Sequence, residues 1–370
     1  MGVDLLFNGV VSNITGKPFD LDFAVTYRCN LRCIQCNVWR QYLEHPERMK
    51  DELSREEIKR IFTSYRDFKV VGITGGEPYM REDLKEIMKI IIEKQRKLKY
   101  LFITTNGTLT DRIIKTLREI LDEMLDAYGD LRLVQLISID GPEEIHDYIR
   151  GVKGTYKKAI KTINLLHGFI DEYDNFSIGT VTVCSPFNID KFDVVLREIT
   201  RLRDKYDLEP SFCVWFSGQL YKNIGEVGDV DVINFRNKLV DYIPRIKDVV
   251  EVGGSPIARG RGIFYDLLKE WLKNPTKQVV PCGAAKVRYF LDAYGDVYPC
   301  TIYNMVIGNL REYGYSFEKL IDSEDRRRVR RLVVEERCPI CCNTCETIPA
   351  ILANPLHTTY KLVVGRIKSK

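Results

Sequence analysis

The sequence predicts an α/β fold: an incomplete parallel (β/α)6 barrel of the TIM type, followed by a small cysteine-rich C-terminal domain. Between residues 21 and 217, short apolar runs rich in β-branched residues alternate with longer amphipathic stretches. Such alternation is typical of parallel strands joined by right-handed helical crossovers. Between residues 282 and 345, by contrast, six cysteines occur in a loop-rich stretch, and such stretches seldom build a core without a metal staple.

Six runs are expected to form the barrel strands. A complete eight-fold barrel would need two further strand–helix units, and beyond Gly218 the strand pattern stops, so we expect the barrel to be incomplete. The strands should begin at Leu21 (LDFAVT), Lys69 (KVVGIT), Tyr100 (YLFIT), Leu133 (LVQLISI), Phe176 (FSIGTVTV) and Pro210 (PSFCVWF).

The first helix between these strands carries a complete start signal. Ser54 and Glu57 have the spacing of a capping box, and Leu53 and Ile58 stand where a hydrophobic staple would pack. We therefore expect a helix to begin directly after Ser54.

The rest of the chain is expected to form four further parts. Residues 1–20 are an N-terminal segment, and residues 218–281 are a helical connecting region that contains the glycine-rich sequence EVGGSPIARGRG. Residues 282–345 form the cysteine-rich domain, in which RYFLDAYGDVYPC predicts a hairpin that turns around Tyr294, Gly295 and Asp296. Residues 346–370 are expected to be a C-terminal tail.

The composition excludes several classes of protein. With 45% apolar and 29% charged residues and no run of 18 apolar residues, no membrane-spanning helix is expected. The start, MGVDLLFNGVVSN, lacks the pattern of an export signal, so we expect a cytoplasmic protein. The net charge is only +4 and the basic residues are scattered among acidic ones, which does not favour a nucleic-acid partner.

Eleven cysteines are many for a reducing compartment, where disulfides rarely persist. Cys29, Cys33 and Cys36 form the pattern CxxxCxxC, which suits a four-iron cluster with one iron left open, because no fourth thiol follows nearby. Zinc is the alternative, but it would require four closed ligands, and His45 is the single further candidate. Two isolated cysteines, Cys184 and Cys213, are expected to be core residues.

The unusual motifs all follow predicted strands. YRCNLRCIQCNVW follows the first strand, GGEP the second, TNG the third and SIDGPEEIHDYIRG the fourth. Because the carboxyl ends of parallel strands meet at one mouth of a barrel, we expect these motifs to form a single site.

In this order and spacing the motifs resemble the radical S-adenosylmethionine superfamily, over roughly residues 21–216. The resemblance implies that S-adenosylmethionine binds the open iron through its amino and carboxylate groups. One electron from an external donor, such as a ferredoxin or a flavodoxin, would then cleave a carbon–sulfur bond under anaerobic conditions. The 5'-deoxyadenosyl radical formed in this way would abstract hydrogen from a substrate.

The resemblance also assigns cofactor-binding roles. Gly75, Gly76 and Glu77 should lie against the methionine amino group, with glycine allowing a close backbone approach. Arg150 should bind the methionine carboxylate, unless it is a charge on a helix surface. In similar enzymes the residue before the third cysteine is often aromatic and helps to hold adenine, but here it is Gln35.

Three further positions complete this predicted cofactor site. Ser138 and Asp140 match residues that touch the ribose or the sulfonium region in similar enzymes, although Ser138 would also suit a sheet. Asn106 either contacts the cofactor or turns the chain beside Gly107.

The C-terminal cysteines resemble the auxiliary-cluster extension of the same superfamily. Four residues separate Gly295 from a cysteine, and a CxxCxxxC pattern follows, as in the shortened, twitch-type form of the SPASM extension with one additional [4Fe–4S] cluster. Zinc is again the alternative, because CxxC pairs also bind zinc. Five thiols compete for four places, with Cys342 as the expected bystander: Cys282, Cys300, Cys338, Cys341 and Cys345.

The motifs favour an enzyme over an iron–sulfur electron-transfer protein, since a relay needs neither an open iron nor a methionine site. A zinc-stabilised scaffold is a third class. For the substrate we expect a hydrophobic molecule such as a lipid chain at an unactivated carbon, ahead of a peptide or a small metabolite. The apolar VDLLFNGVV and the mixed PLHTTYKLVVGRIKSK would suit peripheral membrane contact, and a solvated tail is the alternative.

Overall fold

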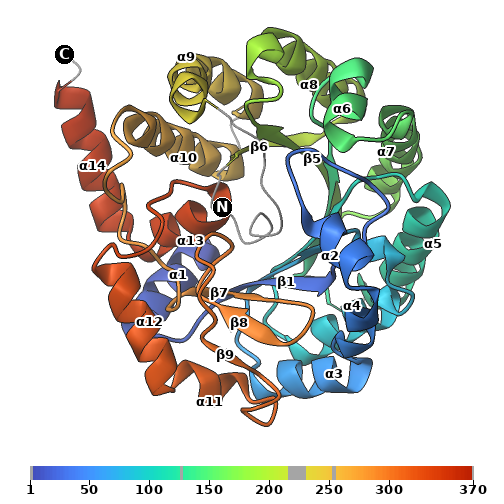
Figure 1. Ribbon diagram of the computed structural model, residues 1–370, viewed down its shortest axis with the longest axis vertical. Coiled ribbons are helices and arrows are strands. Elements are labelled where there is room, and N and C mark those ends of the chain that lie inside the picture. Colours follow the sequence, from blue (N-terminus) through green and yellow to red (C-terminus); the bar gives the residue numbers. More distant parts are fainter. Residues whose placement is uncertain (1–2, 126–127, 216–230, 252–255, 369–370) are drawn as a thin grey trace.

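A computed structural model describes residues 3–125, 128–215, 231–251 and 256–368. Its centre is a nine-stranded sheet in the order β6-β5-β4-β3-β2-β1-β7-β8-β9. The first six strands are parallel to their neighbours and curl into part of a barrel (Figure 1). The predicted incomplete barrel is confirmed, and each strand begins within one residue of its expected position: β1 (Asp20–Thr26), β2 (Val70–Gly75), β3 (Tyr100–Thr105), β4 (Arg132–Ser138), β5 (Phe176–Cys184) and β6 (Glu209–Val214).

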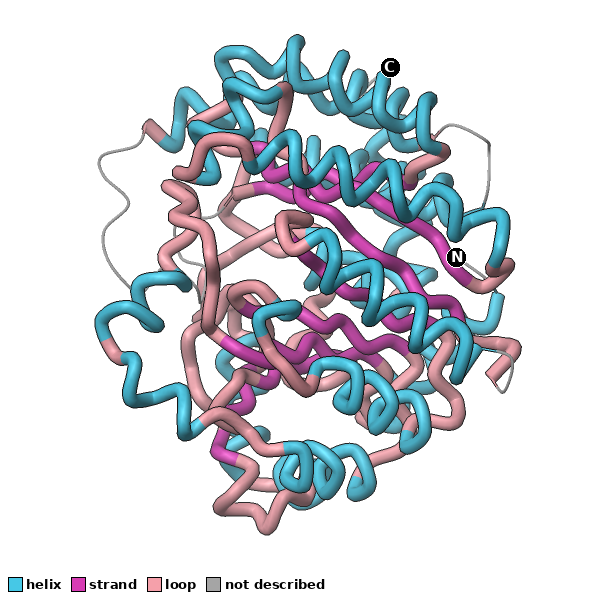
Figure 2. The backbone as a smooth tube through the Cα atoms, turned by 90° about the vertical axis from the view of Figure 1, so that its right-hand side faces the viewer, coloured by secondary structure: helices cyan, strands magenta, loops and turns pink. Residues whose placement is uncertain are grey.

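Amphipathic helices cover the outer side of these strands (Figure 2). The first, α3, begins at the predicted capping box: the Ser54 hydroxyl accepts from Glu57 N, and the Glu57 carboxylate accepts from Ser54 N at 2.8 Å. Leu53 and Ile58 are both fully buried, as a staple requires. The helices between strands are α3 (Arg55–Ser64), α4 (Leu84–Lys94), α5 (Thr110–Ile120), α6 (Glu143–Arg150), α7 (Thr155–Glu172) and α8 (Phe192–Tyr206). Short elements lie between them: α2 (Val38–Glu44), η1 (Pro46–Asp51), η2 (Pro78–Met80), η3 (Leu121–Leu125) and η4 (Ile189–Lys191).

Side chains alternate between the two faces of the barrel sheet. Val71 and Leu101 point outward into the core beneath the helices and are fully buried. Asp22, Gly72 and Phe102, which share one register across β1, β2 and β3, line the lumen instead. The core of the protein therefore lies between sheet and helices, and the lumen holds polar groups.

The cysteine-rich domain continues the barrel sheet. β7 (Arg288–Leu291) lies parallel to β1 and antiparallel to β8 (Asp296–Tyr298), which pairs with β9 (Gly308–Asn309). Gly295 turns this hairpin with a φ of +94°, as expected for glycine. The hairpin is confirmed, but the sequence did not predict that its first strand would extend the barrel beside β1.

The connecting region forms two long helices in its described part. α9 (Val232–Val250) and α10 (Pro256–Lys273) pack against each other, and α9 also contacts α8 and β6, so they prolong the helical ring (Figure 1). Residues 218–230 lie outside the described residues, as does the 252–255 part of the glycine-rich sequence. The end of that sequence, ARGRG, belongs to α10.

The two ends of the chain form helices that meet at the barrel. α1 (Val3–Thr15) packs along α13 (Thr344–Ala353), and a Cβ at Gly9 would lie 2.6 Å from the Leu352 carbonyl. α14 (Pro355–Lys368) follows directly. The expected C-terminal tail is therefore wrong for residues 346–353, because α13 buries Ala350 and Ile351 in the core. For residues 355–368, which form α14, the tail stays a prediction. No helix among the described residues is long and apolar enough to span a membrane.

The C-terminal part is also tied to α3. Arg311 Nε lies 2.7 Å from Glu57 Oε1, and the Tyr315 hydroxyl donates to the same oxygen at 3.0 Å. Burial would raise the pKa of Glu57, but the hydrogen bonds from Arg311, Ser54 and Tyr315 outweigh it and lower the pKa to about 2. α11 (Phe317–Ile321) and α12 (Glu324–Val334) complete this region.

Candidate active site

The loop after β1 carries Cys29, Cys33 and Cys36, and a turn with a Cys36 N to Cys33 O hydrogen bond of 3.2 Å brings them together. The loop is anchored to the end of α6, where Ile34 N donates to Ile149 O at 2.9 Å. Gly151 ends α6 with a φ of +69°, and any Cβ there would overlap the carbonyl oxygen of Arg32. The predicted meeting of the first and fourth motifs is therefore present.

Burial keeps these thiols protonated as long as no metal is bound. Burial raises the pKa of Cys33 to about 12; the Arg150 guanidinium opposes this rise, and Cys36 adds to it. Buried thiols of this kind ionise at neutral pH when a metal replaces their protons. Among the described residues, no three His, Cys, Asp or Glu side chains are arranged to hold a single metal ion.

Glu77 connects the second and third motifs. Its carboxylate is fully buried and accepts hydrogen bonds from the Thr105 hydroxyl at 2.7 Å, Asn106 N at 2.7 Å and Tyr79 N at 3.2 Å. Burial raises its pKa to about 7, against the lowering effect of these hydrogen bonds. The geometry shows Glu77 as the junction of two loops, and its contact with a methionine amino group stays a prediction.

The two glycines before Glu77 bring backbone segments together. Gly76 N donates to Thr26 O at 2.8 Å, and Glu77 N donates to Arg28 O at 2.7 Å. A Cβ at Gly75 or at Gly76 would overlap the same β1-side carbonyls, and Gly75 also has a φ of +131°. Glycine is therefore required here for packing between loops, whatever ligand lies beside them.

Asn106 does turn the chain, since its side-chain oxygen accepts from Thr108 N at 2.9 Å and Gly107 has a φ of +73°. It also reaches the cysteine loop, because its side-chain amide donates to Asn30 Oδ1 at 2.8 Å. Asn30 was missed in the sequence, where nothing distinguished it from other loop residues.

Asp140 and Arg150 form a buried ion pair beside the cysteine loop. Arg150 Nη2 lies 2.8 Å from Asp140 Oδ2, and Arg150 Nη1 lies 4.0 Å from Cys33 Sγ. Arg150 is therefore not a helix-surface charge. Ser138 ends β4 with an exposed fraction of 9% and lies two residues before Asp140.

Two unsatisfied atoms face this cluster of residues. Arg150 Nε and Gln35 Oε1 are buried and have no hydrogen-bond partner among the described residues, while Gln35 Nε2 donates to Asp140 Oδ2 at 3.3 Å. Buried polar atoms normally have partners, so these two atoms, on side chains that both contact Asp140 Oδ2, mark positions where a polar ligand can bind.

A cavity of about 360 Å³ fills the barrel lumen below this edge. Its upper wall includes Thr74 and Thr104, which directly precede the last residues of β2 and β3. Its floor is closed by α1 and α13, through Leu5 and Leu352. The arrangement can place a substrate group in the lumen, at the same end of the sheet as the motif-bearing loops.

One wall of the cavity carries charges that the sequence did not mark. Arg288 is fully buried and is paired with Asp22, with Asp20 at 3.6 Å and with Glu346 at 4.0 Å. Burial raises the pKa of Asp20 to about 7, and Arg288 opposes that rise. A Cβ at Gly72 would overlap the Asp22 carboxylate, so glycine at this position makes room for the acid in the lumen. The signal that could have found them is an Asp at alternate positions of an otherwise apolar strand.

The auxiliary cysteines are divided between two cavities. Cys282, Cys300, Cys338 and Cys341 line one small cavity together, and Glu346 reaches it while accepting from Thr301 N at 3.1 Å. Cys345 does not line this cavity.

Cys345 lies instead in the lumen wall, near Cys213 and Arg288. Its predicted place among the cluster ligands stays a prediction; in the structure α13 begins at Thr344 and this side chain lines the barrel lumen. Cys342 is a buried core residue, as expected of a bystander, whereas Cys213 lines the lumen and is not a simple core residue.

Comparison with known proteins gives two family matches. Residues 23–199 match the radical SAM superfamily, and residues 282–346 match an iron–sulfur cluster-binding domain known as SPASM.

Two curated relatives are similar over much of the chain. Fe-coproporphyrin III synthase of Methanosarcina barkeri is 32% identical over 62% of this chain and 52% of its own length. The antilisterial bacteriocin subtilosin biosynthesis protein AlbA of Bacillus subtilis is 34% identical over 84% of this chain and 61% of its own. The chain thus spans between half and two thirds of the length of these relatives. Streptococcus suis SuiB, solved with its precursor peptide SuiA, has the same fold, with a TM-score of 0.56, 17% identity, and 88% of this chain and 69% of that chain covered.

Proposed function

Since this chain belongs to the radical S-adenosylmethionine superfamily and carries the iron–sulfur cluster-binding domain of its SPASM members, we propose that it is a peptide-modifying radical enzyme. It would cleave S-adenosylmethionine reductively and remove hydrogen from a peptide substrate. The observation that carries the proposal is the position of the lumen cavity, directly below the loops that bring Cys33, Arg150 and Glu77 together.

The residues at the carboxyl ends of the barrel strands would have separate binding roles. Cys29, Cys33 and Cys36 would hold the first [4Fe–4S] cluster, which would supply the electron that cleaves S-adenosylmethionine to methionine and a 5'-deoxyadenosyl radical. Arg150 and Gln35 would bind the polar end of the cofactor through their unsatisfied atoms. Asp140 holds Arg150 in place, which fixes the direction of its remaining donors.

A second [4Fe–4S] cluster would be held by four cysteines that share one small cavity. Glu346 lies between that cavity and the lumen wall, since it is close to Arg288 and hydrogen-bonded to Thr301. Cys345, which lines the lumen, is not one of the ligands in this proposal. The four ligands are Cys282, Cys300, Cys338 and Cys341.

The lumen sets limits on the substrate. A volume of about 360 Å³ holds one or two side chains, and its wall offers both apolar groups and the Asp22 carboxylate. A peptide could place such side chains inside while its backbone stays at the mouth. The relatives support this class, because one is named for bacteriocin biosynthesis and SuiB was solved with a precursor peptide.

The lipid substrate expected from the sequence is supported less well. That hypothesis depended on free apolar ends, yet residues 346–368 are helical and α1 packs on α13 with Leu5 buried. Leu6, Phe7 and Ile14 do remain exposed on α1, so membrane contact stays a prediction. A small metabolite is the second candidate, favoured by the similarity to Fe-coproporphyrin III synthase.

Anaerobic reconstitution followed by reduction tests the proposal. The wild-type protein should convert S-adenosylmethionine to 5'-deoxyadenosine, and the Cys29→Ala, Cys33→Ala, Cys36→Ala variant should not. Equal cleavage by the triple variant would refute the cofactor assignment, and no cleavage by either would favour an electron-transfer protein. Addition of a defined peptide library, Fe-coproporphyrin III or phospholipid would then show which class raises the cleavage rate, and no response to peptides would refute that substrate class.

A further inference from the structure

Two segments of the molecule carry only basic charges. Residues 28–43, which hold the cysteine loop and most of α2, contain three arginines and no acid. Residues 148–158, at the end of α6 and the start of α7, contain one arginine and three lysines and no acid. The whole chain is nearly balanced, with 56 basic and 52 acidic residues, so this local excess is a property of the two segments.

The fold places these segments against each other. Arg32 N donates to Arg150 O at 3.1 Å, and the Cα of Gly151 packs against the carbonyl oxygen of Arg32. Val152 and Lys153 follow at the surface, where Val152 has an exposed fraction of 37% and Tyr148 of 63%. Arg32, Arg40 and Lys153 therefore lie on neighbouring segments beside the cysteine loop, with the apolar Tyr148 and Val152 exposed nearby, and we call these residues the basic surface. Arg150 is buried against Asp140 and Arg28 pairs with Glu52, so neither belongs to it.

Trp39 connects this surface to a proposed cluster ligand. Its indole Nε1 donates to the carbonyl oxygen of Cys33 at 3.3 Å, and its ring is partly exposed. Arg32 and Arg40 both lie against the ring, with guanidinium carbons 5.2 and 5.3 Å from its centroid. A single hydrogen bond therefore connects a partly exposed aromatic ring to the backbone of Cys33.

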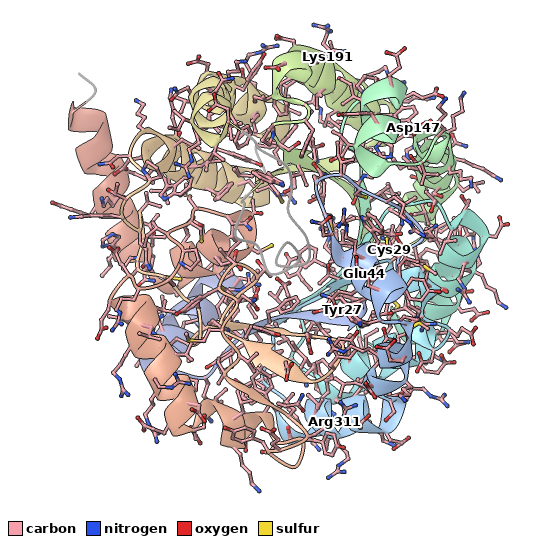
Figure 3. The ribbon with its side chains drawn as sticks, in the orientation of Figure 1. Tyr27, Cys29, Glu44, Asp147, Lys191 and Arg311 are labelled. Carbon is pink, nitrogen blue, oxygen red and sulfur yellow. The ribbon has the colours of Figure 1, made fainter. Side chains whose placement is uncertain are left out.

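Several of these charges are available to a partner. Arg32, Arg40 and Lys153 have no ion pair within the part of the chain that the structure describes. The nearby acids are mostly occupied: Glu143 pairs with Lys157 at 2.9 Å, and Asp147, labelled in Figure 3, caps α7 through Gly154 N and Tyr156 N. Glu144 and Glu44 border the surface without ion pairs in that described part.

We propose that this basic surface is the docking site of a small acidic electron-carrier protein, which reduces the first cluster through the Trp39 side of the cysteine loop. The inference rests on the proposed function, because a reductive reaction needs a one-electron donor. Unpaired charges around an apolar centre suit fast, salt-sensitive association with a partner of opposite charge.

The experiment compares two reductants for the same reaction. Formation of 5'-deoxyadenosine is measured with reduced flavodoxin and, separately, with reduced methyl viologen, a small cation that needs no docking surface. For Arg40→Gln, Lys153→Gln the flavodoxin-driven rate should fall about five- to tenfold at low ionic strength, since steering by charge is lost. The viologen-driven rate should be unchanged. Salt should lower the wild-type flavodoxin rate and leave the viologen rate unaffected.

Arg60→Gln is the matched control. Like Arg40, Arg60 lies over an aromatic ring, with its guanidinium carbon 4.0 Å from the centroid of Tyr315, but it does not contact the cysteine loop. It should leave both rates unchanged. Equal loss with both reductants, or no loss with flavodoxin, would overturn the docking site. Failure of the wild-type protein to cleave S-adenosylmethionine with methyl viologen would instead refute the proposed function.

Discussion

The division of the auxiliary cysteines between two cavities allows a direct test. Cys341 shares its cavity with three other thiols, whereas Cys345 lies in the lumen wall with Cys213. Cys341→Ala should therefore remove a cluster ligand, and Cys345→Ala should not. The sequence pattern CxxCxxxC includes both cysteines and does not favour Cys341 over Cys345 as a ligand. The two variants therefore test whether the structure identifies the ligand correctly.

The expected magnitude follows from the ligand sets. Each cubane carries four irons, so the reconstituted wild-type protein should contain about eight, Cys341→Ala about four and Cys345→Ala about eight. Cys345→Ala removes one thiol from the wall of an existing cavity, and it should lower the free energy of unfolding by less than about 1 kcal/mol. Losing the metal staple should lower the unfolding temperature much further, because metal binding contributes directly to folding.

Iron and zinc analysis after anaerobic reconstitution provides the measurement, and electron paramagnetic resonance of the reduced proteins gives an independent count of clusters. Cys342→Ala is the control: it is a buried neighbour whose sulfur accepts from the Thr347 hydroxyl at 3.7 Å. It should keep eight irons. The reasoning is refuted when Cys345→Ala loses four irons while Cys341→Ala keeps all eight, or when zinc occupies the site in the wild-type protein.

Three further variants test the remaining arrangement. Gly76→Ala would force the Arg28 carbonyl, at the start of the cysteine loop, to move. Less than about half of the protein should then assemble the first cluster, as measured by iron content and paramagnetic resonance. Asp140→Asn removes the buried partner of Arg150 and should lower the free energy of unfolding by about 3 kcal/mol, measured by denaturant titration; an unchanged value would contradict the ion pair. Glu57→Gln should cost about 1 to 2 kcal/mol at pH 7, discounted because Arg311 is one third exposed. Since the folded pKa of Glu57 is lowered to about 2, this contribution is complete above pH 4.5 and is lost as the pH falls toward 2, so the two proteins should converge in acid.

Local patterns in the sequence predicted much of the fold. The six parallel strands and the capping box at Ser54 depend on neighbours within a few residues, and these interactions are readable in order along the chain. The pairing of β7 with β1 was not predicted, because it joins residues 268 positions apart, such as Asp20 and Arg288, and an alternating strand gives no sign of its partner.

The candidate site shows the same limit. The order of the motifs predicted a common mouth for Cys33, Glu77, Asp140 and Arg150, since parallel strands must end together. It did not predict that Glu77 would be enclosed by Thr105 and two backbone amides, because hydrogen-bond partners are chosen by packing between loops.

From the sequence one can predict which segments form the barrel strands, and which thiols, glycines and charged groups follow the ends of those strands. How these groups are distributed between the lumen and the smaller cavity depends on the folded structure. In the folded protein Cys345 lines the lumen, and Cys341 lines a cavity with three other thiols. Asp22 and Arg288, on the neighbouring strands β1 and β7, form an ion pair. The physical reason is that side-chain direction depends on where a helix begins and which strands pair, and both depend on contacts between distant parts of the chain.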